Sequence, residues 1–349
     1  MKSRRVADSR IGARIRVCLA LTSTLILLNP TPAHAASTLA QVQAQVRALQ
    51  EDAAAAAEQA QQAQVEFNKL SKQLASVQQQ AAQQSGNLDS LKKTLGAIAA
   101  DQYKSGGMSQ SMELLFSSDP KLYLAAAGSL ESITKKKSLQ LRKYAVAKQR
   151  LTATSLTVND KISLAAKAKA RYVAQLASAN AKLQQAQTIL DKLSKAERER
   201  LAALVNGQED ADQKASAALA ASANLGSGRG ASALRFAIKQ IGDRYVFGAA
   251  GPTLWDCSGL TMRAFGAAGV SLPHSAASQM SRGKKIGFAS LKPGDLVFFN
   301  HGGNSYVSHV GIYLGGGRMV HAPHTGARVK VTDFGTSFGR LRFAGGRRI

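Results

Sequence analysis

The chain has 349 residues, which is enough for about two domains. It carries 46 Lys and Arg against 21 Asp and Glu, a formal net charge of +25. Only two cysteines are present, which excludes a fold held together by several disulfides. The charge predicts attraction to polyanions but selects no particular ligand.

The first 35 residues have the three parts of a secretory signal peptide. Basic residues come first, residues 17–28 form a short apolar core, and Ala33-His34-Ala35 supplies an A-x-A cleavage site. A membrane anchor is the alternative, but it needs roughly 20 apolar residues and this core has about 12. We therefore expect residues 1–35 to be removed and the protein to be secreted.

Export changes the meaning of the cysteines and of the charge. Cys18 leaves with the signal peptide, so Cys257 remains alone and cannot form an internal disulfide. Its thiol is then either buried or chemically employed. An exported protein rarely meets nucleic acid, so we expect no nucleic acid partner. The anionic polymers of a bacterial wall are the partners that the charge favours, and we expect a wall-associated location.

Residues 37–205 are predicted to form a long helical hairpin, a coiled coil within one chain. Apolar residues recur in steps of three and four over residues 39–98, which is a coiled-coil seam with alanines in its middle. A looser series follows over residues 141–193, where Lys169 takes a seam position. Glycine and proline between the series predict a small helical tip around residues 104–128. A coiled coil between chains is the main rival.

The rest of the chain is predicted to be a linker and a second domain. Residues 206–230 are rich in Gly, Ala and Ser, which is typical of a flexible linker. Residues 231–349 read as helices followed by an antiparallel meander, an α+β domain. Helices are expected at 231–240 and 257–266, and strands at 295–299, 309–314, 318–321, 328–331 and 341–343.

Cys257 begins the second of these helices. Asp256 is placed to cap its N-terminus, so Cys257 would lie in the first turn, where free N–H groups and the helix dipole favour a thiolate. A lowered thiol pKa is what a nucleophilic cysteine requires. The alternative is a small buried apolar residue, and this segment alone does not decide between the two.

Two histidines could supply the base and the group that orients it. His309 starts one predicted strand, and His321 follows a turn at residues 315–317. A three-residue loop at 314–316 sets the two directly opposite, and one at 315–317 sets them on the diagonal, both within reach. A two- or four-residue loop would put them on opposite faces of the sheet.

The remaining histidines give weaker signals. His274 follows a proline in a loop before a short helix, where it could contact substrate, and His301 and His324 are expected on surface loops. A zinc site at Cys257 would usually bring cysteine pairs, and the sequence has none. No metal and no cofactor is therefore expected.

Residues 231–349 resemble the NlpC-type cysteine peptidases, which are bacterial cell-wall endopeptidases. The resemblance rests on ordered blocks at family-like spacing, which together are more specific than any one of them. The blocks are Arg244-Tyr245-Val246-Phe247-Gly248, Asp256-Cys257-Ser258-Gly259-Leu260, Leu291-Lys292-Pro293-Gly294-Asp295-Leu296-Val297-Phe298-Phe299, Ser308-His309-Val310-Gly311-Ile312-Tyr313-Leu314 and Met319-Val320-His321-Ala322-Pro323.

The resemblance implies a papain-like fold and a role for each matching residue. Cys257 is the expected nucleophile, His309 the base and then the acid, His321 the orienting third residue, and Tyr245 a donor near the oxyanion. Arg244, Phe247 and His274 depart from the usual residues of the family and leave the substrate preference open. The expected substrate-binding residues are Ser258, Asp256, His274 and Ser308.

The implied activity is hydrolysis of an amide in the peptidoglycan stem peptide, most often the γ-D-glutamyl to diamino acid bond. An amidase of related fold that cuts the sugar–peptide bond and a non-enzymatic wall-binding protein are the alternatives. The N-terminal arm resembles the coiled coils of secreted wall hydrolases of Gram-positive bacteria, including actinobacteria. That resemblance implies a regulatory or docking arm, which blocks the active site or binds a membrane division complex.

Overall fold

A computed structural model describes residues 38–104, 119–302, 305–335 and 337–349. The predicted signal peptide and most of the predicted tip at 104–128 lie outside these residues. Within the described ranges, no helix combines the length and the apolar character that crossing a membrane requires.

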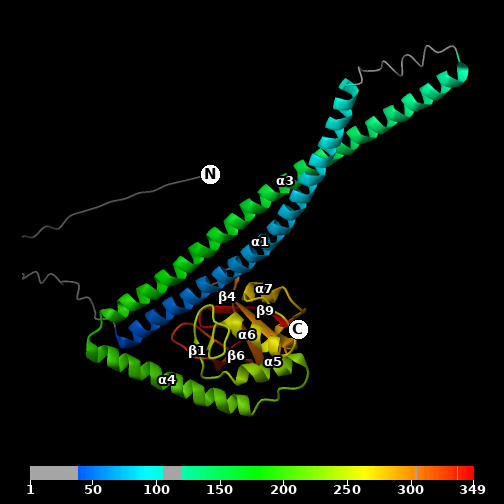
Figure 1. Ribbon diagram of the computed structural model, residues 1–349. Coiled ribbons are helices and arrows are strands. Elements are labelled where there is room, and N and C mark those ends of the chain that lie inside the picture. Colours follow the sequence, from blue (N-terminus) through cyan, green and yellow to red (C-terminus); the bar gives the residue numbers. More distant parts are fainter. Residues whose placement is uncertain (1–37, 105–118, 303–304, 336) are drawn as a thin grey trace, which may run out of the picture. The chain divides into compact units, whose positions relative to one another are not determined.

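The N-terminal arm is a pair of antiparallel helices, α1 (Leu39–Lys104) and α3 (Pro120–Asp191) (Figure 1). Asp119 caps α3, because its carboxylate accepts a hydrogen bond from the backbone of Lys121 at 2.8 Å. The two helices pack against each other extensively within one chain. The predicted intrachain hairpin is therefore observed.

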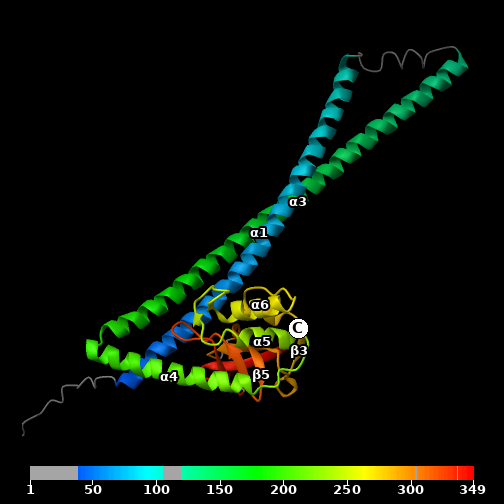
Figure 2. The same ribbon diagram turned by 60° about the horizontal axis from the view of Figure 1, so that its bottom comes forward.

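The seam of this hairpin is tight only in its first half. On α1 the buried positions end at Leu70, which packs with Ala165 and Ala168 of α3. Beyond this point polar contacts replace buried ones, because Lys161 donates a hydrogen bond to Gln73 and Lys137 to Gln102, each at 2.8 Å. The two helices cross and then diverge toward the far end of the arm (Figures 1 and 2). Leu141 and Ile162, predicted in the seam, are 57% and 46% exposed. The seam position predicted for Lys169 is occupied by its neighbour Ala168 instead, because burying a lysine ammonium without a partner costs a large amount of free energy.

The predicted linker at 206–230 is wrong over most of its length. Helix α4 (Lys195–Ala221) runs through it, and Ser194 with Glu197 forms a capping box at its start. Residue composition suggested a linker, but α4 is held by tertiary contacts instead. It packs on strand β7 (Lys330–Asp333) of the C-terminal domain.

Helix α4 covers an edge of the sheet that would otherwise be open. The hydroxyl of Ser216 accepts a hydrogen bond from the backbone of Val331 at 2.9 Å. Lys330 forms ion pairs of 2.8 Å with both Glu209 and Asp212 of α4. The backbone N–H of Val331 on the edge strand is thereby satisfied, and the ion pairs hold α4 over this edge.

The C-terminal domain packs helices on an antiparallel sheet, as predicted for an α+β fold. The sheet has the strand order β3-β9-β4-β5-β6-β7, and β8 pairs with β9. A parallel pair of short strands lies apart from it. The bounds are α5 (Arg229–Ile238), β1 (Arg244–Tyr245), β2 (Leu254–Trp255), α6 (Cys257–Ala267), α7 (Ala276–Met280), β3 (Lys284–Ile286), a 3-10 turn η1 (Phe288–Ser290), β4 (Leu296–His301), β5 (Val307–Gly315), β6 (Arg318–His321), β8 (Ser337–Phe338) and β9 (Leu341–Arg348).

The core of this domain lies between the sheet and helices α5 and α6. Leu234 of α5 and Leu260 and Phe265 of α6 are fully buried against the inward face of β4 to β6. Helix α6 packs on β5. This packing places the start of α6 beside the strand that carries His309.

Helix α1 lies against the C-terminal domain on the side that carries α7 and β5 (Figure 2). Its alanine-rich segment is buried on more than one face: Ala56 and Ala57 pack with Ala179 of α3 and with Phe247 of the C-terminal domain. Small side chains let α1 approach both neighbours at once.

We predict that Ala168→Leu destabilises the arm. Ala168 is fully buried, and added volume in such a packed site costs about 1–3 kcal/mol. Thermal unfolding followed by circular dichroism measures the loss. Ala170→Leu on the exposed face of the same helix is the matched control and should change stability by less than about 0.5 kcal/mol. Equal effects of the two variants would contradict tight packing at Ala168.

Candidate active site

Cys257 occupies the first position of α6, where the sequence places it. Asp256 caps the helix through a 2.6 Å hydrogen bond from the backbone of Gly259. The other carboxylate oxygen of Asp256 accepts a hydrogen bond from the backbone of Gly248 at 2.8 Å. His274 Nε2 lies 2.9 Å from both carboxylate oxygens. Asp256 thus fixes the start of α6 and the loop that precedes it.

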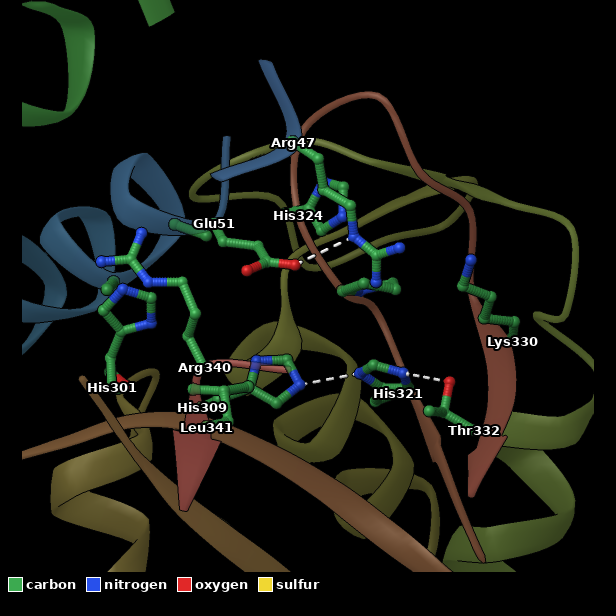
Figure 3. Close-up of a pocket in the computed structure, with 14 residues that line it drawn as sticks. Arg47, Glu51, His301, His309, His321, His324, Lys330, Thr332, Arg340 and Leu341 are labelled. Atoms are coloured by element: carbon green, nitrogen blue, oxygen red, sulfur yellow. Dashed lines mark hydrogen bonds and ion pairs between the residues drawn. The ribbon is translucent and has the colours of Figure 1, made fainter. Parts of the chain in front are cut away.

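His309 and His321 share one face of the sheet. Their rings are joined by a 2.8 Å contact between His309 Nε2 and His321 Nδ1. His321 Nε2 lies 2.8 Å from Thr332 Oγ1 on β7. Thr332 was not singled out from the sequence, because only the sheet register shows which strand lies next to β6. The structure therefore adds a third member to the line of hydrogen bonds (Figure 3).

The register that brings the two histidines together depends on a bulge. Ile312 pairs with Val320, which places His309 on the diagonal from His321, one of the two expected arrangements. The turn itself is shorter than either predicted loop, because Gly315 pairs with Arg318. The register shift between Tyr313 and Gly315 inserts one residue into β5, and this extra residue restores the common face.

Cys257 and Tyr245 are buried in the hydrophobic core that α6 shares with β5. The Cys257 sulfur accepts a hydrogen bond from the backbone of Val310, the residue after His309. Tyr245 is 4% exposed, and burial together with the negative charges of Cys257, Asp256 and Glu58 raises its pKa well above the ordinary value. Its hydroxyl therefore keeps its proton and can act as a donor.

Glu58 of α1 reaches the thiol. Its carboxylate oxygen Oε1 lies 3.2 Å from the Cys257 sulfur and accepts a hydrogen bond from Ser258 Oγ at 2.5 Å. Its second oxygen accepts a hydrogen bond from the backbone of Ala276 at 2.9 Å. Glu58 is 3% exposed and Cys257 2% exposed. The arm thus covers the thiol and places a carboxylate against it.

Further polar contacts hold α1 along the same cleft. Gln62 accepts hydrogen bonds of 2.7 Å from the hydroxyls of Ser275 and Ser278. On the other side of Glu58, Asp52 lies 2.6 Å from His301 Nε2 and 2.7 Å from Arg340. The contact surface therefore consists of hydrogen bonds and ion pairs at both ends of an alanine-rich segment.

The thiol is held in its neutral form. Burial raises the pKa of Cys257 well above the ordinary value, and the charges of Glu58 and Asp256 raise it further. Burial and the charge of Asp256 also raise the pKa of Glu58. The expectation of a lowered thiol pKa from the helix N-terminus is thus wrong for this state, because the arm removes water and adds a carboxylate.

The imidazoles are held neutral as well. Burial lowers the pKa of His309 to about 3, and the charges of His324 and His301 contribute. Burial and the neighbouring His309 and Lys330 lower the pKa of His321 well below the ordinary value. With α1 in place, both the thiol and the imidazoles are uncharged. A thiolate–imidazolium pair is therefore disfavoured.

The expected substrate-binding residues fall into two groups. Asp256 and His274 form a hydrogen bond with each other. Burial acts to lower the pKa of His274, but the hydrogen bond and the charge of Asp256 raise it. Asp256 therefore has a positioning role. Ser258 faces Glu58. The hydroxyl of Ser308, in contrast, is buried and has no hydrogen-bond partner among the described residues.

A cavity of about 70 Å³ remains between α1 and the sheet, lined by Ser308, His309, His321 and Arg340 (Figure 3). Ala54 and Ala55 of α1 form part of its wall. This cavity continues the cleft from the catalytic candidates toward the end of β4. In the described part of the chain, no group of three or more metal-ligating side chains could hold a metal ion.

Two histidines lie elsewhere than expected. His301 ends β4 and is 6% exposed, because Asp52 covers it. His324 lies in the loop between β6 and β7 but is half-buried beside the arm. A surface position was inferred for both from the C-terminal domain alone, and helix α1 provides the cover.

Other important contacts escaped the sequence reading. Gln279 is fully buried and bridges Thr261 with the backbone of Ser258 and Pro273 at 2.7–2.9 Å. Glu58 is the single acidic residue in a long run of Ala and Gln. An isolated acidic residue in such a stretch could have marked Glu58 as a candidate functional residue. No sequence pattern connects Glu58 with Cys257.

Comparison with known proteins places the C-terminal domain. Residues 242–348 match the family described as the NlpC/P60 family. The chain is 46% identical over 90 residues to "Probable endopeptidase p60" of Listeria monocytogenes, covering 26% of this chain and 18% of that protein. It is also 42% identical over 101 residues to "Probable endopeptidase Mb2213c" of Mycobacterium bovis, and this match covers 29% of this chain and 25% of that protein.

A solved structure is similar to about a third of this chain. The NlpC/p60 domain of the peptidoglycan hydrolase SagA is 35% identical, and the match covers 34% of this chain and 98% of that one, with a TM-score of 0.30. The chain spans a quarter or less of the length of the curated relatives named above. The arm lies outside the matched family region.

We predict that Cys257 reacts slowly with iodoacetamide in the intact chain. Its thiol is buried under α1 and has a raised pKa. Glu58→Ala removes the carboxylate and should speed alkylation by about tenfold or more. Mass spectrometry of the peptide that contains Cys257 measures the rate. Glu66→Ala is the matched control, since its ion pair with Arg171 is exposed; faster alkylation in that variant would show general loosening instead.

Proposed function

We propose that this chain, which carries an NlpC/P60 domain at residues 242–348, is a secreted peptidoglycan hydrolase that cleaves an amide of the stem peptide. The bond proposed is the one between γ-D-glutamate and the diamino acid. The observation that carries the proposal is the hydrogen-bonded pair His309 and His321 on β5 and β6, with Cys257 at the start of α6 bonded to the backbone of β5 next to His309. Relatives of the domain named as endopeptidases support the reaction class.

The reaction proceeds through a thioester. Cys257 gives its proton to His309, and the thiolate attacks the carbonyl carbon of the amide. Tyr245 donates a hydrogen bond toward the oxyanion that forms. The intermediate collapses when His309 returns the proton to the leaving amine and the C–N bond breaks. Water then attacks the thioester while His309 takes its proton, which restores the thiol and releases a carboxylic acid.

The hydrogen bonds around His309 select the tautomer that this reaction requires. In the productive arrangement His309 Nε2–H donates to His321 Nδ1, and His321 Nε2–H donates to Thr332 Oγ1. Nδ1 of His309 is then the acceptor for the thiol proton. His321 and Thr332 act as positioning residues, because they hold the ring and its tautomer without touching the substrate.

The arm is proposed to keep the enzyme inactive until it is displaced. Glu58 occupies the position beside Cys257 that a substrate carbonyl must take, and α1 buries the thiol. Displacement of α1 would restore water to the site and remove one negative charge, both of which lower the thiol pKa. A membrane-bound division complex is the proposed site of displacement, and the basic surface is proposed to retain the protein at the anionic wall.

We predict that Cys257→Ala abolishes cleavage of purified muropeptides in the Glu58→Ala background. His309→Ala should lower kcat by about 100- to 10,000-fold, and His321→Ala should cost less, because it affects orientation only. Mass spectrometry of the products also identifies the bond. Residual cleavage by Cys257→Ala would contradict the nucleophile, and equal losses at both histidines would contradict the orienting role. A new amino group on alanine would indicate an amidase.

Inhibition by Glu58 should weaken as pH rises. The pKa of Glu58 is raised from 4.5 when α1 is docked, so the docked arm binds a proton more tightly than the displaced arm. Docking is therefore strongest below pH 4.5 and weakens as pH rises through the raised pKa. The rate of the natural chain divided by that of Glu58→Gln should increase over this range. The ratio cancels the pH dependence of the chemistry, and a constant ratio would contradict the mechanism.

A further inference from the structure

Helix α1 presents two carboxylates, Glu58 and Asp52, to polar groups of the C-terminal domain. A third, Glu51, lines the cavity beside His309 and pairs with Arg47 of the same helix. Glu58 lies against Cys257 and Ser258. Asp52 precedes it by six residues, which is about 9 Å along the helix axis. Between them stand Ala54 and Ala55, which leave the cavity unfilled. The arm therefore resembles a ligand with two anionic groups and little bulk between them.

Asp52 occupies a cationic site that the sheet builds. His301 Nε2 lies 2.6 Å from its carboxylate, and Arg340 lies 2.7 Å from the same oxygen. Partial burial acts to raise the pKa of Asp52. The hydrogen bond from His301 and the charge of Arg340 outweigh this effect, so the pKa is lowered. Lys182 of α3 is a more distant third cation, at 3.7 Å.

The two cationic residues belong to the C-terminal domain and not to the arm. His301 ends β4 and pairs in the sheet with Leu341, the residue after Arg340. The backbone of Gly302 donates a hydrogen bond to the carbonyl of Arg340 at 3.0 Å. The β4–β9 ladder thus holds the pair together. It remains in place when α1 leaves.

The cavity joins this cationic pair to the catalytic candidates. His309, His301 and Arg340 all line it. Ser308, next to His309, contributes a buried hydroxyl without a hydrogen-bond partner among the described residues. A buried hydroxyl is normally paired, so this one indicates that a polar group of a bound molecule enters the cavity.

We propose that Arg340 and His301 form the subsite for the side-chain carboxylate of the diamino acid on the leaving side of the scissile bond. The proposal rests on the proposed function. Asp52 fills this subsite in the inactive chain, and Ser308 faces the peptide between the subsite and His309. The enzyme therefore prefers a diamino acid whose side chain ends in a carboxylate beside its second amine over lysine, which ends in an ammonium alone.

The dimensions agree with this chemistry. A side chain of such a diamino acid carries its carboxylate roughly 7 Å from the leaving amine when extended, comparable with the axial offset between Glu58 and Asp52. A guanidinium binds a carboxylate through charge-assisted hydrogen bonds. The same pair repels an ammonium. The main-chain carboxylate of the leaving residue is attached to the carbon that carries the amine, so it lies closer to the scissile bond than the side-chain carboxylate does.

The test compares substrates within one enzyme variant. In the Glu58→Ala chain, kcat/KM is measured for a stem tripeptide with a free side-chain carboxylate, for the side-chain amide, for the lysine peptide and for the main-chain amide. The free side-chain carboxylate should be preferred over its amide by about tenfold or more. Displacement of the arm affects all four peptides equally, so it cancels from each ratio.

Arg340→Gln should reduce this preference to nearly one, because the cation that distinguishes the free carboxylate from its amide is removed. Arg342→Gln, at an exposed arginine on β9, is the matched control and should keep the full preference. An unchanged preference in Arg340→Gln, or equal losses on all four peptides, would overturn the subsite. A preference that follows the main-chain carboxylate would overturn its assignment to the side chain.

A binding measurement separates failure of the subsite from failure of the proposed function. Calorimetry with the Cys257→Ala, Glu58→Ala chain gives Kd for the free and amidated tripeptides without any cleavage. If no peptide is cleaved but Arg340→Gln removes a tenfold difference in Kd, the subsite stands and the proposed reaction fails. If peptides are cleaved and Kd shows no such difference, the reaction stands and the subsite fails.

Discussion

The contact between the Glu58 carboxylate and the start of α6 fixes much of the structure. A buried carboxylate is tolerated only where hydrogen bonds replace water, and Cys257, Ser258 and the backbone of Ala276 supply them. These donors exist at one place in the C-terminal domain. Helix α1 must therefore lie along the cleft in one register, and the alanines around Glu58 let it do so.

The same contact explains why the catalytic candidates are uncharged. Excluding water raises the pKa of the thiol and lowers the pKa of His309, and a carboxylate beside the sulfur adds to the first effect. The arm therefore acts on Cys257 and His309 through their electrostatics and through burial.

The arm is attached by contacts that can be exchanged. Its surface against the cleft consists of alanines, hydrogen bonds and ion pairs, with few large apolar side chains. Water or a substrate can satisfy the same polar groups once α1 leaves. Helix α4 differs, because besides its polar contacts with β7 it packs the large apolar side chain of Leu219 on the hydrophobic core of the C-terminal domain. We infer that α1 is the part that moves and that α4 is the part that stays.

Sequence alone determined the local features of this protein. Helical periodicity gave the hairpin, and alternation and turns gave most strands. Ordered motifs singled out Cys257, His309 and His321 as candidates. Each of these features is encoded by neighbouring residues. The tertiary structure decided what depends on distant residues. The bulge in β5, the partner Thr332, the helix at the supposed linker, and Glu58 and Asp52 in the cleft arise from packing between segments more than ten residues apart or from sheet register, which no local pattern records.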